Sequence, residues 1–183
     1  MKTLETDRLI LRPFTNDDVE IHRVIFSDPE VCHYYCGKTR TEEETREWLI
    51  HRKWQARDSE ELGFLAVVRK EDKQILGLVA LQLSVSFWLR SELEPESPFN
   101  PLTIELSYAI GREYQRQGYA TEACRALIEY GFKEMRLQRL TNGVSMENVP
   151  TNRLCQTLGF RQVKNVHPES DGHVWILDNP LAE

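Results

Sequence analysis

The sequence has no long hydrophobic run. No apolar stretch reaches the length of about 18 residues that a membrane-spanning helix needs. The first residues, Met1–Asp7, mix charged and polar side chains with isolated apolar ones and lack the apolar core of a secretory leader. We therefore expect a cytoplasmic protein with no membrane partner.

The sequence is also poor in cysteine, with four in 183 residues. Cys32 and Cys36 flank His33, a spacing that can serve a metal. A closed zinc site needs four ligands, and no second CxxC or HxxxH pair completes one. We therefore predict no metal site and four reduced thiols that mostly pack as small apolar side chains.

Positive charge is in deficit. The chain carries 23 Lys and Arg against 29 Asp and Glu, which gives a formal net charge of −6 at pH 7. A duplex-binding protein normally clusters positive charge, so we predict no nucleic-acid partner. The motifs GxxxxGKS/T and GxGxxG are missing as well, which argues against a P-loop and a dinucleotide-binding fold.

What the sequence does contain is typical of one globular domain. Of its residues, 40% are hydrophobic and 28% charged, which excludes a disordered or fibrous chain. No internal repeat or long linker interrupts it, so we predict a single domain over residues 1–183. Caps, turns and hydrophobic periods predict strands at 8–12, 64–68, 75–81, 103–110, 139–144, 160–166 and 173–177, and helices at 16–28, 41–57, 121–135 and 150–158. This order predicts an α/β protein with a mixed sheet flanked by helices.

Residues 89–102 differ from the rest in composition. They contain Pro95, Pro98 and Pro101 together with the acidic Glu92, Glu94 and Glu96. We predict a surface insertion between two strands. Both a functional loop and a disordered flap are compatible with this composition.

The most informative segment joins the strand at 103–110 to the helix at 121–135. The strand ends with Tyr108-Ala109-Ile110, and Gln115-Arg116-Gln117-Gly118-Tyr119-Ala120 leads straight into the helix. The first N–H groups of a helix have no internal partner, and the helix dipole places partial positive charge there. Gly118 and Ala120 let a ligand approach the backbone closely. We therefore predict an anion site formed by main-chain N–H groups.

Three segments resemble a known family. Gln115-x-x-Gly118-x-Ala120 resembles the pyrophosphate loop of the GCN5-related N-acetyltransferases (GNAT), R/Q-x-x-G-x-G/A. The segment from Asn148 to Phe160 resembles the family's N-x-x-S/A-x-x-L/V/I-x-x-x-x-G-F element. The opening Thr6–Arg12 resembles that of the RimJ/RimL-like subgroup, which acetylates ribosomal-protein N-termini. The resemblance covers residues 3–178 and implies the GNAT fold, a mostly antiparallel twisted sheet of about seven strands flanked by helices.

The resemblance implies a site for acetyl-CoA as co-substrate. Tyr108, Ala109 and Ile110 would pair through their backbone with the pantetheine arm, and the Ile110 N–H would stabilise the charge that develops on the thioester carbonyl. Main-chain N–H groups would bind the pyrophosphate, and they belong to Gln115, Arg116, Gln117, Gly118, Tyr119 and Ala120. Asn148 would hydrogen-bond the cofactor arm or the reacting end, and Asn152 would also reach the cofactor.

The resemblance further implies direct attack of a free primary amine on the thioester in a ternary complex. Glu105 lies on the strand that would carry the cofactor and is the candidate base, with substrate binding or simple solvent exposure as the alternative. Many relatives carry a tyrosine that protonates the leaving thiolate, but this chain has Cys155 at that position. A thiol with a pKa of about 8.5 could act as the acid, or Cys155 could pack in the core.

No motif specifies the acceptor. An α-amine with a pKa near 7.8 costs about 1 kcal/mol to deprotonate at pH 7, whereas a lysine amine near 10.4 costs roughly 4–5 kcal/mol. A protein N-terminal α-amine therefore asks little of a base, and a small-molecule amine remains the alternative acceptor. An acyl-CoA-binding sensor with weak catalysis is a second alternative, because the tyrosine is missing. The family also makes a homodimer a reasonable expectation.

Overall fold

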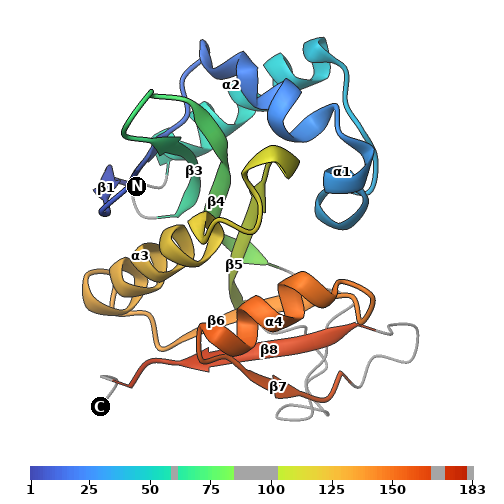
Figure 1. The fold of residues 1–183 in the computed structure, drawn as a ribbon. Coiled ribbons are helices and arrows are strands. Elements are labelled where there is room, and N and C mark those ends of the chain that lie inside the picture. Colours follow the sequence, from blue (N-terminus) through green and yellow to red (C-terminus); the bar gives the residue numbers. More distant parts are fainter. Residues whose placement is uncertain (59–61, 85–102, 166–171, 181–183) are drawn as a thin grey trace. The chain divides into compact units, whose positions relative to one another are not determined.

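The computed structural model describes residues 1–58, 62–84, 103–165 and 172–180 (Figure 1). The chain divides into two compact units. The first comprises Met1–Leu81 and Ser107–Leu127, and the second comprises Gln82–Leu106 and Ile128–Glu183. The chain passes between them within strands β4 (Ile75–Ser84) and β5 (Thr103–Ile110) and within helix α3 (Tyr119–Lys133). The insertion predicted at 89–102 lies outside the described residues.

Four strands of the first unit form an antiparallel meander. β1 (Leu4–Glu5) pairs with β2 (Leu9–Pro13), β2 pairs with β3 (Gly63–Arg69), and β3 pairs with β4. The hairpin predicted over residues 64–81 is therefore confirmed. β1 was not predicted, because its two residues are too short to show an alternating pattern.

The helical region after β2 differs from the prediction. Instead of one helix over residues 16–28, the structure has a 3-10 turn, η1 (Asp18–Glu20), a π-helical turn, η2 (His22–Phe26), and then helix α1 (Pro29–Tyr35). Asp28 and Pro29 begin a helix rather than end one. The Asp28 carboxylate accepts a 2.9 Å hydrogen bond from the Glu30 N–H, and Pro29 occupies the first turn, where its missing N–H is not needed.

Helix α2 (Glu42–Asp58) starts at the predicted capping box. The Thr41 N–H donates to Glu44 Oε2 over 2.7 Å, and the Glu44 N–H donates to Thr41 Oγ1 over 3.1 Å. Trp48 then packs this helix onto β3, with its ring centroid 5.6 Å from that of Phe64 in an edge-to-face arrangement. Its ring also lies 4.9 Å from that of Phe26, so aromatic contacts join η2, α2 and β3.

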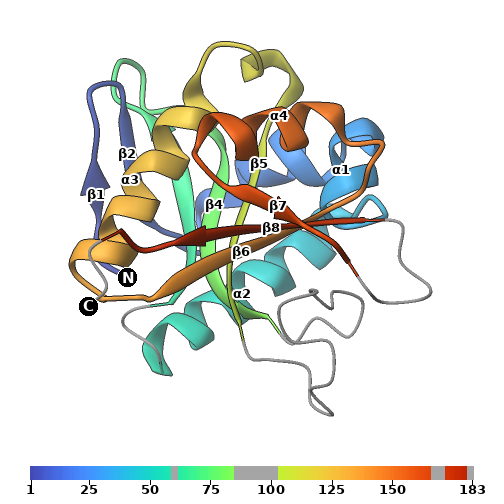
Figure 2. The ribbon, with the colours of Figure 1, turned by 90° about the horizontal axis from the view of Figure 1, so that it is seen from below.

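The second unit holds a mixed sheet (Figure 2). β5 runs parallel to β6 (Arg139–Val144), with Glu105 opposite Thr141. β6 and β7 (Arg161–Val163) both pair antiparallel with β8 (His173–Asp178), which therefore lies between them. The described residues contain eight strands, one more than the seven predicted, and β1 accounts for the difference.

Helix α4 (Val149–Thr157) ends as predicted. Gly159 has a φ of +87°, the left-handed conformation that glycine adopts without a Cβ penalty. The Phe160 N–H donates to the Cys155 carbonyl over 3.0 Å, which satisfies a carbonyl in the last turn of the helix. The chain is thereby turned out of α4 and into β7.

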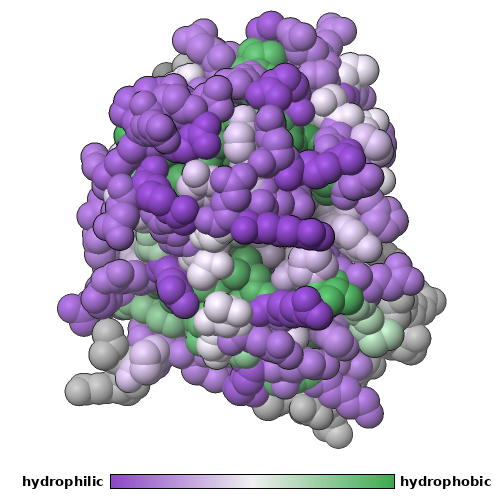
Figure 3. Space-filling model, in the orientation of Figure 1, coloured by the Kyte–Doolittle hydropathy of each residue, from purple (hydrophilic) through white to green (hydrophobic). Residues whose placement is uncertain are grey.

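Side-chain burial follows the sheet pattern in both units. β4 is buried over seven consecutive residues, Ile75–Leu81, so both of its faces are covered. In the second unit, Val163, Val174 and Ile176 form a buried cluster on β7 and β8. The face seen in Figure 3 is mostly hydrophilic, with small apolar areas. Among the described residues, the exposed large hydrophobic ones are Tyr34, Ile50, Leu83, Met146 and Val149, of which only Met146 and Val149 are near each other in sequence.

Candidate functional site

The end of β5 lies unusually close to β4. A Cβ atom on Gly77 would collide with the Ala109 carbonyl oxygen and lie 2.9 Å from Ile110 Cα, so glycine is required at this position. The Gly111 N–H donates to the Leu76 carbonyl over 2.9 Å just beyond the end of β5. The contact with β4 therefore fixes the point from which the predicted anion-binding loop departs.

The turn that follows is anchored by ion pairs. It forms a short 3-10 helix, η3 (Arg112–Tyr114). Arg112 Nη2 lies 2.7 Å from Asp28 Oδ1, and Arg23 Nη1 lies 2.8 Å from Glu113 Oε1. The Arg112 guanidinium donates a hydrogen bond that holds the pKa of Asp28 below its usual value. Both ion pairs tie η3 to the helical region after β2.

The two glutamine side chains of the loop turn back onto the loop itself. Gln115 Nε2 donates to the Ile110 carbonyl over 2.9 Å, and Gln117 Nε2 donates to the Glu113 carbonyl over 3.0 Å. Gln115, Arg116, Gln117 and Gly118 are nevertheless exposed as residues. The loop is therefore accessible to a ligand.

The loop backbone combines left-handed residues with the start of a helix. Arg116 and Gly118 both have left-handed φ angles, +60° and +83°. α3 begins at Tyr119, and the Glu122 N–H donates to the Gly118 carbonyl over 3.0 Å. The N–H groups of the three residues before Glu122 have no acceptor within the helix. Left-handed residues next to a helix start form a concave arrangement of amides that favours negative charge.

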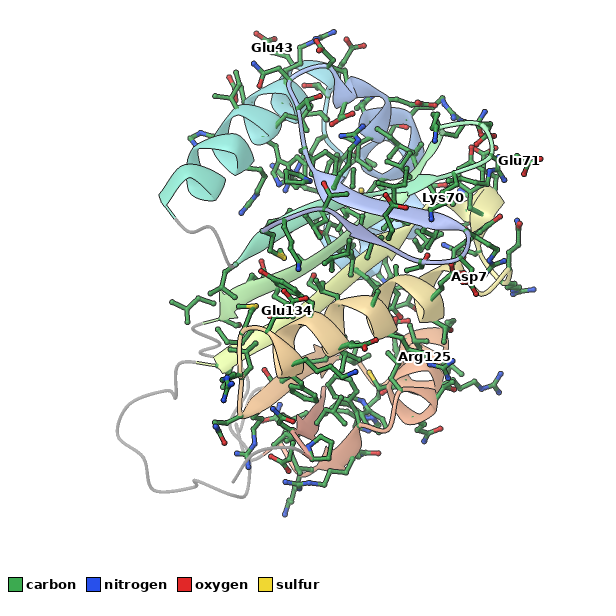
Figure 4. The ribbon with its side chains drawn as sticks, turned by 90° about the vertical axis from the view of Figure 1, so that its left-hand side faces the viewer. Asp7, Glu43, Lys70, Glu71, Arg125 and Glu134 are labelled. Carbon is green, nitrogen blue, oxygen red and sulfur yellow. The ribbon has the colours of Figure 1, made fainter. Side chains whose placement is uncertain are left out.

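A cluster from the turn between β1 and β2 lies at the start of α3 (Figure 4, where Asp7 marks this turn). Glu122, in the first turn of α3, accepts hydrogen bonds from Thr6 Oγ1 (2.6 Å) and from Arg8 Nε (2.7 Å). Arg8 Nη1 donates to the Gln117 carbonyl over 3.1 Å, and its guanidinium lies 4.5 Å from the centre of the Tyr119 ring. Burial alone would raise the pKa of Glu122, but the hydrogen bonds from Thr6 and Arg8 outweigh it and lower the pKa.

Glu105, the candidate base, lies in the second unit on β5. Burial raises the pKa of its carboxyl above the usual value, and hydrogen bonds from the side chains of Ser84 and Gln82 and from the Gly143 backbone act in the opposite direction. A half-buried carboxyl with a raised pKa can exchange a proton closer to neutral pH than an ordinary glutamate. The environment is therefore compatible with the predicted role.

Asn148 caps helix α4. Its side-chain oxygen accepts a 3.2 Å hydrogen bond from the Thr151 N–H. Within the described residues, its amide nitrogen donates to no neighbour. The Asn148 amide nitrogen is therefore available to a ligand even though the oxygen is used in the fold.

Asn152 differs, because its amide group is fully used. Nδ2 donates to the carbonyls of Ser145 (2.9 Å) and Asn148 (3.0 Å). Oδ1 accepts from Trp175 Nε1 (2.9 Å) and lies 3.0 Å from His173 Nδ1. Two donors and two acceptor sites are the whole capacity of an amide side chain. These bonds attach α4 to β8 and favour a structural role over the predicted contact with the cofactor.

Cys155 lies in α4 with 1% of its surface exposed. Burial raises the pKa of its thiol to about 12. Both facts favour the packing alternative over the acid role.

All four cysteines are free thiols, and the part of the chain that the structure describes holds no group of three or more His, Cys, Asp or Glu that could bind a metal. None of the described helices is long and apolar enough to cross a membrane.

Comparison with known proteins places the chain in a family. The model of the acetyltransferase (GNAT) domain matches residues 8–161, a range that includes parts of both units. The chain belongs to the GNAT family. It is therefore an N-acetyltransferase, and GNAT enzymes use acetyl-CoA.

Relatives and solved structures agree with this assignment. An uncharacterized N-acetyltransferase of Bacillus subtilis, YnaD, is 29% identical over 159 residues, which are 87% of this chain and 82% of YnaD. The fold is similar to that of ribosomal-protein-S5-alanine acetyltransferase from Vibrio fischeri, with a TM-score of 0.73, 15% identity and full coverage of both chains (100% each). It is also similar to RimL, named as a ribosomal L7/L12 alpha-N-protein acetyltransferase in complex with coenzyme A, with a TM-score of 0.73, 11% identity and coverage of 97% and 98%.

In this GNAT chain, sequence reasoning missed two supports of the loop. The first is Gly77, whose only signal is a single glycine inside an apolar strand. The second is the contact of Arg8 with Gln117 and Glu122, which joins positions more than 100 residues apart. No local pattern reports such a contact.

Proposed function

We propose that this GNAT enzyme transfers the acetyl group of acetyl-CoA to a primary amine. The observation that carries the proposal is the exposed loop from Gln115 to Gly118, which contains two left-handed residues and leads into the start of α3. The loop amides Gln115, Arg116, Gln117, Gly118, Tyr119 and Ala120 are the proposed partners of the diphosphate. Of these, the Gln115 N–H already donates to the Arg112 carbonyl over 3.3 Å. Each N–H bonded to a charged oxygen contributes roughly 1.5–3 kcal/mol.

The thioester end is assigned to β5. Tyr108, Ala109 and Ile110 are the proposed backbone partners of the pantetheine arm. Asn148 is, separately, a proposed cofactor ligand through its side-chain amide nitrogen. The Ile110 N–H is the proposed donor to the carbonyl oxygen as it becomes negative. Asn152 and Cys155 stay predictions as cofactor ligand and acid, although their hydrogen bonds and burial favour structural roles.

The reaction we propose is a direct acyl transfer. The neutral amine attacks the thioester carbon, the C–S bond breaks, and the coenzyme A thiolate leaves. The amine loses one proton to the base and the thiolate gains one. Glu105, with its raised pKa, is the candidate group for accepting the proton.

The acceptor we propose is an α-amine at a peptide or protein N-terminus. The ribosomal-protein acetyltransferases among the similar structures support this class, since two of them are named for modifying protein N-termini or an alanine of a ribosomal protein. An α-amine also makes little demand on Glu105, because deprotonation costs only about 1 kcal/mol at pH 7. A small-molecule amine remains the alternative acceptor. Two further expectations, a single domain over the whole chain and a homodimer, remain predictions.

The test combines binding and turnover. Calorimetry with coenzyme A should show one site, and a thiol-release assay with acetyl-CoA and a panel of amines should give higher kcat/KM for peptides with a free α-amine than for the same peptides blocked at that amine. Preference for non-peptide amines would transfer the proposal to the alternative acceptor. Coenzyme A binding without turnover on any amine would instead identify a sensor.

A further inference from the structure

The guanidinium of Arg8 contacts the loop from Gln115 to Ala120 on one side and the first turn of helix α3 on another. Nε donates to Glu122 Oε2 over 2.7 Å, and Nη1 donates to the Gln117 carbonyl over 3.1 Å. Nη2 would lie 3.3 Å from a Cβ atom on Gly118, so the guanidinium lies directly against the loop. Three loop or helix residues therefore meet one side chain from the N-terminal segment.

The backbone of Arg8 is itself fixed. Its N–H donates to Glu122 Oε1 over 2.9 Å, and its carbonyl accepts from the Lys70 N–H over 2.9 Å, next to the paired strands β2 and β3. The side chain is about half exposed, at 47%, so its contacts with the loop do not result from enclosure in a core. These hydrogen bonds hold the Arg8 backbone in place, and the backbone in turn places the guanidinium against the loop.

The contact with the Gln117 carbonyl determines the direction of one loop amide. In a trans peptide the C=O and the following N–H point in opposite directions within one plane, and none of the described peptide bonds is cis. Because the Gln117 carbonyl points to Arg8, the Gly118 N–H points away from Arg8. We propose that Arg8 is a positioning residue that orients this peptide plane so that the Gly118 N–H can bind the diphosphate of the acetyl donor.

A role of Arg8 through charge alone is the competing explanation. Glu122 is a carboxylate in the first turn of α3, the same turn whose amides are proposed to bind an anion. Its ion pair with Arg8 offsets the repulsion that this carboxylate would exert on a diphosphate. If Arg8 acts only by offsetting the charge of Glu122, restoring the charge balance should restore acetyl-CoA binding. If Arg8 orients the peptide between Gln117 and Gly118, restoring the charge balance should not. Variants can therefore separate the two roles.

The inference rests on the proposed function and has a specific consequence. The loss of Arg8 should weaken the binding of ligands that contain the diphosphate and leave ligands without it unaffected. Acetyl-CoA and acetyl-pantetheine form the comparison pair, because both carry the same thioester and only the first carries the diphosphate and the 3′-phosphoadenosine attached to it. A merely structural role of Arg8 would lower the use of both.

The experiment measures kcat/KM of the full chain for both donors with one peptide acceptor. Arg8→Ala should lower kcat/KM for acetyl-CoA about tenfold through KM, and kcat/KM for acetyl-pantetheine should stay within about twofold. Arg46→Ala, which removes another exposed arginine paired with a carboxylate (Glu42), is the control and should change neither value. Calorimetry with coenzyme A should show the same loss of affinity for Arg8→Ala.

Two further variants separate orientation from charge. Arg8→Lys keeps the positive charge but not the planar fork that reaches Glu122 and Gln117 together. Arg8→Ala combined with Glu122→Gln removes the uncompensated carboxylate. Orientation predicts that both variants remain about as weak for acetyl-CoA as Arg8→Ala.

Three results would overturn the inference. Full recovery in Arg8→Lys or in the double variant would show that Arg8 acts through charge alone. An equal loss with both donors would show a general structural role. Unchanged acetyl-CoA kinetics in Arg8→Ala would show that Arg8 does not act on the site. The proposed function fails separately, if the unmodified chain itself binds no coenzyme A.

Discussion

The two family motifs of this chain use their polar groups in opposite ways. In Gln115–Ala120 the glutamine side chains bond back onto the turn, while the exposed residues Arg116 and Gly118 have left-handed φ angles just before the start of α3. In Asn148–Phe160, both polar atoms of the Asn152 amide group form hydrogen bonds within the fold, and these bonds attach α4 to β8. The first motif stays exposed, and we propose that it binds a ligand, whereas the second mostly attaches a helix to the sheet. Resemblance to a family motif therefore does not by itself identify ligand contacts.

The largest expected effect comes from changing the loop backbone. Gly118→Val places a β-branched side chain at a φ of +83° and 3.3 Å from Arg8 Nη2. The loop should move, and losing one or two amide–phosphate hydrogen bonds should raise the Kd for coenzyme A about 100-fold in calorimetry.

Gly37→Val is the matched control for this prediction. Gly37 has a similar φ of +78°, and a Cβ there would meet nothing within 4 Å. Gly37→Val should cost about 1–2 kcal/mol of backbone strain, as Gly118→Val should, but leave the Kd for coenzyme A unchanged. Equal losses of affinity in both variants would mean that strain, and not the loop, weakens binding.

The second motif should respond in stability. Asn152→Ala leaves the Trp175 indole N–H without its acceptor and removes one of two hydrogen bonds at each of the Ser145 and Asn148 carbonyls, so the free energy of unfolding should fall by about 1–3 kcal/mol in urea titrations. The Kd of the folded fraction for coenzyme A should hardly change. Arg153→Ala, an exposed change on the same helix, should alter neither quantity. A large rise in Kd without loss of stability would restore Asn152 as a cofactor ligand.

Glu105→Gln should lower the activity of the enzyme but not its stability. If Glu105 is the base, kcat with a peptide α-amine should fall about tenfold, a modest loss because this amine needs little help. In the unmodified enzyme the rate should rise as pH increases through the raised pKa of Glu105, and the variant should lose that step. An unchanged pH profile would remove Glu105 from the mechanism.

The same variant has a stability effect of known sign. A carboxyl with a raised folded pKa contributes stability that is complete below its unfolded pKa and is lost as pH rises through the folded pKa. At neutral pH the fold therefore bears the cost of the buried charge. Glu105→Gln should unfold at a higher temperature than the unmodified chain at pH 8, and the difference should shrink as the pH is lowered.

The smallest effect is expected at Cys155. Cys155→Ala removes a small buried side chain and should cost about 1 kcal/mol of stability, measured by chemical denaturation. Because burial raises the pKa of the thiol to about 12, kcat should remain within about twofold of that of the unmodified enzyme. A drop in kcat of tenfold or more would identify Cys155 as the acid after all.

Local patterns predicted much of this fold. The strands at 103–110 and 139–144 have the predicted bounds, and the caps of α2 and α4 were readable because they lie within a few residues of the helix ends. Asp28-Pro29 was misread, because the same two residues can end one helix or begin the next.

The candidate site was only partly predictable. The loop from Gln115 to Ala120 could be found, because its glycine and the following helix are adjacent in sequence. The contribution of Arg8 could not, because its partners lie more than 100 residues away. Whether an asparagine such as Asn152 binds a ligand or its own fold depends on tertiary contacts that the sequence does not show.

The most direct measurement is a titration of ¹⁵N-labelled protein with coenzyme A, followed by amide chemical shifts. Binding by main-chain amides at the start of α3 predicts that the amides of Gln117, Gly118, Tyr119 and Ala120 show the largest shifts, and that inorganic pyrophosphate shifts the same amides. Coenzyme A binding that leaves these four amides unmoved would contradict the central claim.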